Sequence, residues 1–405
     1  MKNLLILTSG YCGKATANGL CAQALVKAME KEGLGAYIVS CDTEQVSVDP
    51  GGKVVSLWCP RLDTVQPKRS FLQRVWNRMK LTVLYTWTPK YQKQMVEKLV
   101  KAASDICKET DISGIVCMFF PLETIIAGWH LKKRFPQIPM IVYELDSVTD
   151  GIGGSVKRNG SLLFSYRRFM GALYKKADSV MVLKCHEKCW LKEHDGHKTK
   201  MRIVDLPLVF PAELPQAQEK TPEPQMLYAG ELSLQYRSPQ CLLKACESLE
   251  ESFSLHFYSK GCETQLQEAA EKDGRIHCHG YVDRSTLNAA VARADIMLSI
   301  GNQVSNSLPS KIITYMTYGK PIIHFSLQPN DICAEYLKQY PLALVLEWNT
   351  DIQSAAGRIA AFMKESAGKT VPFGTLEEMF PMNVPAYSLL EIRKVIGWGC
   401  DNEQP

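Results

Sequence analysis

Residues 296–325 read IMLSIGNQVSNSLPSKIITYMTYGKPIIHF, and this stretch decides the fold class. The apolar run 296–300 predicts a buried strand, and residues 310–318 predict a helix that the turn at 319–321 ends. Residues 321–325 form a second apolar run and predict the next strand. Short buried strands joined by a helix indicate a parallel sheet that helices cover on both faces.

The same alternation runs through both halves of the chain. Toward the C-terminus we expect strands at 225–229, 254–258 and 275–278 and helices at 239–249, 263–272 and 284–294. Toward the N-terminus we expect a helix at 15–31 and strands at 4–7, 36–40, 115–120, 140–145 and 179–183. We therefore predict an α/β fold of two Rossmann-like, doubly wound parallel-sheet domains that face a cleft.

A proline-rich segment separates the two halves. It contains Pro207, Pro211, Pro215, Pro222 and Pro224, with a polar run at 216–223. Such a composition is typical of a linker between domains. We expect an N-terminal domain at 1–208, a linker at 209–224 and a C-terminal domain at 225–382.

Composition excludes some classes of protein. The 405 residues are 46% hydrophobic and 22% charged, which is typical of globular domains. The net charge of +5 is too small to indicate a nucleic-acid partner, and we expect none. The charge is unevenly spread, because residues 1–210 hold 31 Lys and Arg against 19 Asp and Glu, whereas residues 211–405 are net acidic.

Residues 61–101 concentrate the positive charge, with ten Lys and Arg against two acids, interleaved with aromatic side chains. This pattern favours a surface that touches anionic lipid, and the alternative is a solvated helical face packed on the first domain. No apolar run suits a signal peptide or a spanning helix, and the 14 cysteines have no framework spacing. We expect a cytoplasmic protein that associates peripherally with the inner face of the membrane.

Several catalytic and metal motifs are missing from the sequence. It has no G-x-x-x-x-G-K-[ST], no G-x-G-x-x-G and no G-x-S-x-G. Gly10 and Gly13 follow the first strand and predict either close backbone contact with a ligand or a tight turn alone. The cysteines and histidines at 185, 189, 194 and 197 lack the loop that usually separates two pairs of zinc ligands, so we expect no metal.

The strongest functional signal is the start of the helix at 310–318. Ser307 and Ser310 offer hydroxyls there, and Lys311 adds a cation beside free backbone amides. Dipole, amides, hydroxyls and ammonium together suit phosphate, although a plain helix cap is the alternative.

Two more loops at carboxyl ends of strands carry glycines and cations. Gly230 precedes Arg237, and Lys260 precedes Gly261. Three such loops on one domain predict a site for a diphosphate. In the N-terminal half, Asp146 follows a strand and is our candidate for orienting or activating an acceptor, with a turn cap as the alternative.

Four segments of the C-terminal half carry a resemblance to a known family: 228–232 (YAGEL), 276–282 (IHCHGYV), 294–296 (ADI) and 306–321. The chain resembles the retaining glycosyltransferases of family 4, which have the GT-B fold, and in particular the subgroup with Ser-Lys at the helix start. The resemblance implies that the C-terminal domain binds a UDP- or GDP-linked sugar and that the other domain binds the acceptor. It also implies that residues 383–405 hold a helix, at 386–398, that crosses back onto the first domain.

The resemblance further implies roles for single residues. Tyr281 and Val282 would lie beside the base, and Arg237 and Lys311 would neutralise the diphosphate. Asn306 and Thr314 stand where many members carry glutamates and are our candidates for contacts to the sugar. Glu231 stands where a basic residue is common.

The expected function is transfer of a hexose-like sugar from a nucleotide sugar to a lipid-linked or polysaccharide acceptor, in bacterial cell-surface glycan synthesis. No D-x-D lies near the expected diphosphate site, which fits a reaction without metal or other cofactor. Two alternatives stay open. One is a degenerate GT-B protein that acts as a partner in a glycan assembly complex. The other is a GT-B sugar-nucleotide epimerase.

Overall fold

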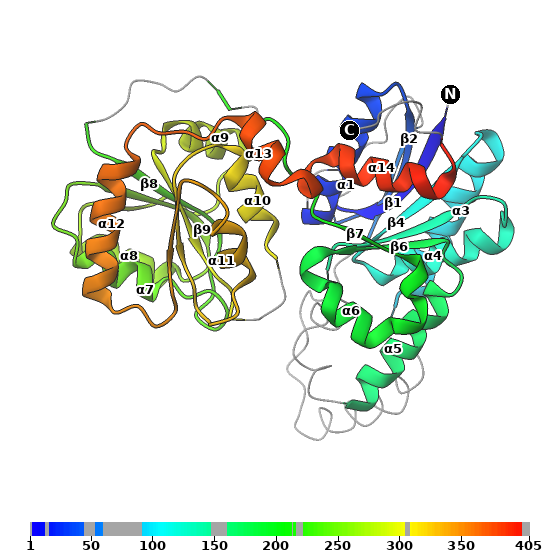
Figure 1. The fold of residues 1–405 in the computed structure, drawn as a ribbon, viewed down its shortest axis with the longest axis horizontal. Helices are drawn as coiled ribbons and strands as arrows, with labels where there is room; N and C mark the ends of the chain where they lie inside the picture. The colour runs from blue at the N-terminus through cyan, green and yellow to red at the C-terminus, as the bar shows by residue number, and fades with distance from the viewer. Residues whose placement is uncertain are drawn as a thin grey trace. The chain divides into compact units, whose positions relative to one another are not determined.

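The computed structural model describes residues 2–12, 16–43, 53–59, 91–146, 160–212, 214–215, 222–303 and 308–398. The chain divides into two compact units, Met1–Leu208 with Met382–Pro405, and Val209–Pro381. Each unit is built on one parallel sheet whose strands alternate with helices (Figure 1). The predicted α/β fold with two Rossmann-like domains is therefore confirmed.

The N-terminal unit has a seven-stranded sheet in the order β3-β2-β1-β4-β5-β6-β7. Its strands are β1 (Asn3–Ser9), β2 (Gly35–Asp42), β3 (Val54–Trp58), β4 (Gly114–Phe119), β5 (Met140–Glu144), β6 (Ser179–Leu183) and β7 (Met201–Val204). Its helices are α1 (Ala17–Lys31), α3 (Lys93–Glu109), α4 (Leu122–Arg134), α5 (Gly160–Tyr174), α6 (Glu187–His194) and α14 (Pro385–Ile396), with the 3₁₀ turns η1 (Lys184–His186) and η2 (Asp195–Lys200).

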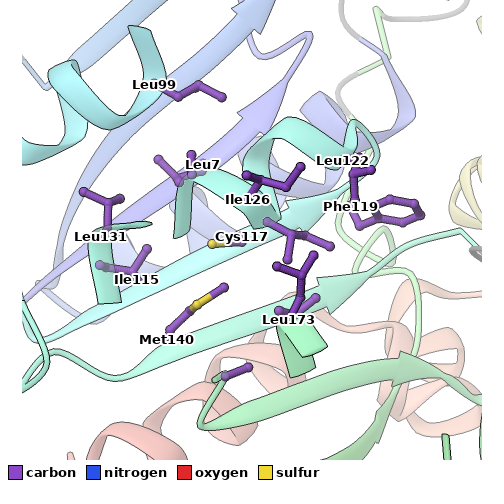
Figure 2. Packing of buried hydrophobic residues seen from close by; sticks show 14 of the residues in the cluster. Leu7, Leu99, Ile115, Cys117, Phe119, Leu122, Ile126, Leu131, Met140 and Leu173 are labelled. Atoms are coloured by element: carbon purple, nitrogen blue, oxygen red, sulfur yellow. The ribbon is translucent and has the colours of Figure 1, made fainter. Parts of the chain in front are cut away.

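A glycine lets helix α4 lie close to this sheet. A methyl group on Gly128 would lie 2.2 Å from Sγ of Cys117 in β4. Figure 2 shows Cys117 and Met140 from neighbouring strands, with Ile126 and Leu131 of α4 nearby. Close packing of this kind maximises dispersion contacts and burial, which together stabilise the core.

Helix α3 holds the described end of the basic segment 61–101. Its apolar face, including Met95 and Leu99, is buried in the core, whereas Lys93 and Lys98 are exposed. The described part therefore packs its apolar face on the first domain and exposes lysines, and residues 61–90 lie outside the described residues. Among the helices described, none combines the length and apolarity needed to cross a bilayer.

The C-terminal helix α14 belongs to the N-terminal unit, where it packs beside α1 (Figure 1, red and blue). The Tyr143 hydroxyl and Oγ of Ser388 are 2.8 Å apart, and both side chains are buried. Arg202 and Glu391 form an ion pair of 3.0 Å. The helix ends earlier than residue 398, because Gly397 has a φ of 70° and caps it.

The C-terminal unit has a six-stranded sheet in the order β10-β9-β8-β11-β12-β13. Its strands are β8 (Gln225–Glu231), β9 (Ser254–Lys260), β10 (Ile276–Cys278), β11 (Ile296–Ile300), β12 (Ile322–Phe325) and β13 (Ala343–Leu346). Its helices are α7 (Gln240–Glu247), α8 (Glu263–Lys272), α9 (Arg284–Arg293), α10 (Ser310–Thr317), α11 (Ile332–Leu337), α12 (Ile352–Ser366) and α13 (Phe373–Met379). Strand order reverses between β8 and β11, and ligands of doubly wound sheets bind at the carboxyl side of such a reversal.

Candidate functional site

The loops after β8 and β11 are tied together at the point where strand order reverses. Ser233 and Arg237 exchange backbone hydrogen bonds of 3.1 and 2.8 Å, which closes a tight turn after β8. The amide of Gln303, after β11, donates to the carbonyl of Tyr236 over 2.9 Å. These bonds fix the backbone that carries Arg237.

The guanidinium of Arg237 is hydrogen-bonded to described residues through its two Nη atoms but not through Nε. Its Nη2 donates to Oδ1 of Asn302 over 2.6 Å, and Nη1 lies 3.4 Å from the carbonyl of Glu231. Its Nε is buried and has no hydrogen-bond partner among the described residues. Because a buried unpaired donor is costly, this guanidinium is prepared for an acceptor.

Lys311 lies beside Arg237 and has no carboxylate partner within the described part of the chain. Its Nζ lies 4.7 Å from the centre of the Tyr228 ring. A methyl group on Gly230 would lie 1.9 Å from this nitrogen, so the ammonium uses the space that the glycine leaves. Burial, and to a smaller extent the neighbouring charge of Arg237, lower the pKa of Lys311 to about 7. Two neighbouring cations without a counter-charge form a site for an anion.

Helix α10 begins directly beside this pair. Its first residues are Ser310 and Lys311, and no side chain among the described residues caps its N-terminus. The amides of the first turn of a helix have no partner within the helix and suit an anion. The Thr314 side chain binds its own helix, because its hydroxyl donates to the carbonyl of Ser310 over 3.2 Å.

The loop after β9 touches the loop after β8 through a second glycine. The amide of Leu232 donates to the carbonyl of Lys260 over 2.8 Å. A methyl group on Gly261 would lie 2.2 Å from the carbonyl oxygen of Leu232, so only glycine permits this approach. The structure thus brings the three predicted loops together, and Lys260 is exposed beside them.

The remaining predicted residues of the nucleotide site are less closely connected. Tyr281 and Val282 follow β10, two strands away from β8, and the Tyr281 side chain is 66% exposed. Gly13, Asn306 and Ser307 lie outside the described residues.

Gly10 and Asp146 belong to the N-terminal unit. A methyl group on Gly10 would lie 2.4 Å from Cγ2 of Thr16, whose hydroxyl accepts the Gly19 amide and caps α1. Packing at the start of α1 therefore requires glycine at this position, with a φ of 63°. Asp146 is half-buried after β5, and burial raises its pKa to about 6, which suits a proton acceptor near neutral pH.

Sequence reasoning missed two residues of the site, Asn302 and Tyr228. Asn302 orients Arg237 through a hydrogen bond, and the ring of Tyr228 contacts the ammonium of Lys311. A polar residue directly after a buried strand is the signal that points to Asn302. The backbone just before Asn302 lies close to the buried Asp331, because a methyl group on Gly301 would lie 2.1 Å from Oδ2 of that residue. That carboxylate also lies 3.0 Å from Nε2 of His324.

The cysteine and histidine run at 185–197 forms an aromatic cluster. The ring of His194 is 5.0 Å from that of Tyr174 and 5.4 Å from that of Trp190. Burial lowers the pKa of His194 to about 4, so this imidazole is neutral near pH 7. Within the described ranges, no group of three or more metal-binding side chains is arranged to hold an ion.

Residues 223–363 match the family model described as group 1 glycosyl transferases, and they include Arg237 and Lys311. A glycosyltransferase from Rickettsia africae has a similar structure, with a TM-score of 0.65, 13% identity and coverage of 99% of both chains. Anabaena HepE in complex with UDP-glucose aligns with a TM-score of 0.61 and 13% identity, over 96% of this chain and 100% of its own. The fold is GT-B.

The GT-B fold also occurs in enzymes of another class. A Listeria monocytogenes protein assigned as a UDP-N-acetylglucosamine 2-epimerase aligns with a TM-score of 0.59 and 13% identity, over 100% of both chains. No curated protein sequence matches this chain. The structural likeness therefore defines the GT-B architecture, and the match over residues 223–363 supports a glycosyltransferase.

Proposed function

We propose that this protein transfers a sugar, with retention, from a UDP- or GDP-linked donor to a lipid-linked or polysaccharide acceptor. The observation that carries the proposal is the pair Arg237 and Lys311, two adjacent cations that form no ion pair with any described carboxylate. They lie within the segment that matches group 1 glycosyl transferases. A nucleotide sugar places two negative charges at its diphosphate, which the pair would balance.

The donor reaction breaks the bond between the anomeric carbon and the β-phosphate oxygen. Negative charge then grows on the leaving diphosphate, and donors already in place stabilise it most effectively. Arg237 offers its unpaired Nε–H and Lys311 its ammonium, while the first amides of α10 add the helix dipole. Because side chains supply this positive charge, we propose that transfer needs no metal ion, and activity that survives EDTA would support this point.

We propose that Asp146 acts on the acceptor. Its pKa of about 6 leaves it ionised near neutral pH but still able to accept a proton. As the acceptor oxygen bonds to the anomeric carbon, its proton passes to the carboxylate. Positioning the acceptor hydroxyl against that carbon lowers the barrier further.

The biological setting is a proposal of its own. We propose bacterial cell-surface glycan synthesis at the cytoplasmic face of the membrane, supported by the basic composition of residues 61–101. The full chain should co-sediment with anionic vesicles at low salt and dissociate as salt is added. Equal binding to neutral vesicles, or none to either, would contradict this part.

The central test compares Lys311→Ala with the wild type and with Lys369→Ala, an exposed lysine of the same unit. Binding of UDP- and GDP-sugars is measured by calorimetry, and sugar release and transfer are followed with radiolabelled donors. We expect Lys311→Ala to lose at least about tenfold in affinity and most turnover, with an unchanged melting curve. Wild-type turnover in Lys311→Ala, or conversion of the donor to an epimer without transfer, would overturn the assignment.

A further inference from the structure

A small cavity lies in the C-terminal unit away from the Arg237–Lys311 pair. It has a volume of about 70 Å³, and its wall includes Gln225, Leu227, His256, Tyr258 and Arg293. The cavity is lined by Leu227, whereas Lys311 lies over the ring of Tyr228, the next residue of β8, and successive side chains of a strand point to opposite faces of the sheet. The cavity is therefore distinct from the diphosphate site.

Arg293 gives the cavity a positive charge. Its side chain is half-buried at the end of α9, and the guanidinium has no hydrogen bond or ion pair with any residue of the described ranges. No Asp or Glu is among the residues that line the cavity. The nearby carboxylate of Asp295 is engaged by the backbone amide of Gln225 at 2.9 Å.

A second cation, Lys320, binds the carbonyl groups at the same end of α9. Nζ of Lys320 donates to the carbonyl of Ala292 over 3.0 Å and to that of Ala294. Lys320 thus satisfies the carbonyls that carry the negative end of the helix dipole. Because Lys320 already binds these carbonyls, the guanidinium of Arg293 is not needed to cap the C-terminus of α9.

Strand β9 contributes His256 and Tyr258 to the lining of the cavity, and Tyr258 supplies a further donor. Nδ1 of His256 lies 3.0 Å from Nε2 of His279, and its Nε2 lies 3.3 Å from Oγ of Ser254, so both ring nitrogens are engaged. The ring of Tyr258 stacks on that of His279 at 4.4 Å and 9°. The Tyr258 hydroxyl has no hydrogen bond with the described residues, so it remains available.

We propose that this cavity binds an oxyanion of the phosphate class, held by the Arg293 guanidinium and the Tyr258 hydroxyl. A space of about 10–15 Å³, measured in this way, is enough for one water, so a cavity of about 70 Å³ has room for several waters or one tetrahedral oxyanion. An arginine fork with a neighbouring hydroxyl matches the several acceptor oxygens of such an ion. The proposal does not depend on transferase activity.

The test measures binding of inorganic phosphate to the full chain by phosphorus NMR and calorimetry, in the Lys311→Ala background so that the diphosphate site contributes little. Arg293→Gln should weaken binding about tenfold, and Tyr258→Phe should weaken it several-fold. The matched control is Arg284→Gln, which removes the same charge from the other end of α9 and should leave binding unchanged.

The outcomes separate cleanly. Equal weakening by Arg284→Gln and Arg293→Gln would mean that only net charge matters and would overturn the site. Binding that is unaffected by both Arg293→Gln and Tyr258→Phe would overturn it as well. If Arg293→Gln fails to fold, Tyr258→Phe alone decides, because it keeps the ring stacking. Glycerol 3-phosphate, tested in parallel, distinguishes free phosphate from a phosphate ester as the source of the oxyanion.

Discussion

The ammonium of Lys311 occupies the space that a side chain at Gly230 would fill. A methyl group on Gly230 would lie 1.9 Å from Nζ and 2.6 Å from Cε of the lysine. The glycine also has a φ of 131°, a conformation that other residues rarely adopt. The end of strand β8 and the start of helix α10 are thus fitted to each other at the point where the anion is expected.

Gly230→Ala should displace the Lys311 ammonium and weaken the binding of nucleotide sugars by at least about tenfold. The backbone strain should cost about 1–3 kcal/mol of folding free energy. Calorimetry with a UDP-sugar measures the first effect, and denaturant unfolding measures the second. The control is Gly368→Ala, which has a φ of 69° and open space around it and should lose stability only. Equal affinity in wild type and Gly230→Ala would refute the role of the glycine.

Asn302→Ala should release Arg237, because the 2.6 Å hydrogen bond that orients its guanidinium is lost. A hydrogen bond to a charged group is worth about 1.5–3 kcal/mol, so affinity for the diphosphate should fall by roughly ten- to a hundredfold. Asn302→Asp should bind still more weakly, since its carboxylate would pair with Arg237 and compete with the ligand. Calorimetry should therefore give affinities that decrease in the order wild type, Asn302→Ala, Asn302→Asp. A reversed order for the two variants would show that orientation of Arg237 is not what Asn302 provides.

Donor binding should depend on pH through Lys311. Its pKa of about 7 in the free protein rises when an anion binds, because the ammonium gains a partner. Affinity should therefore be highest below pH 7 and fall as pH rises above 7, by up to about tenfold per pH unit, with a proton taken up on binding. The probe is a UDP-sugar, whose phosphates do not titrate in this range. A slope that persists in Lys311→Gln would assign the effect to another group.

Stability should fall with rising pH because of a buried acid in the N-terminal unit. Burial raises the pKa of Glu144 to about 8, well above its value in an unfolded chain, and the Tyr174 hydroxyl donates to it. The neutral carboxyl is favoured when folded, so stability is full at acid pH and is lost as pH rises toward 8. Glu144→Gln keeps the shape without the charge and should flatten this loss. Thermal melts across the pH range measure it, and parallel curves for both proteins would contradict the assignment.

Local pattern was enough to predict the elements that build the C-terminal site. Strand β11 and helices α8 and α10 follow the apolar runs and breakers of the sequence closely, because each is short and sharply bounded. The strands β3 and β7 carry no comparable signal. Both are outermost strands of a sheet and are largely half-buried, so their side chains do not form a continuous apolar run.

Residue type and position alone pointed to Gly230, Arg237 and Lys311, because glycines and cations at the carboxyl ends of strands are a local feature of the chain. Three other features arise only in the tertiary structure: the orientation of Arg237 by Asn302, the lowered pKa of Lys311 and the unpaired charge of Arg293. Each depends on burial and on partners from distant strands and helices. Desolvation and hydrogen bonding act over a few ångströms in space, so they are defined only once the chain has folded.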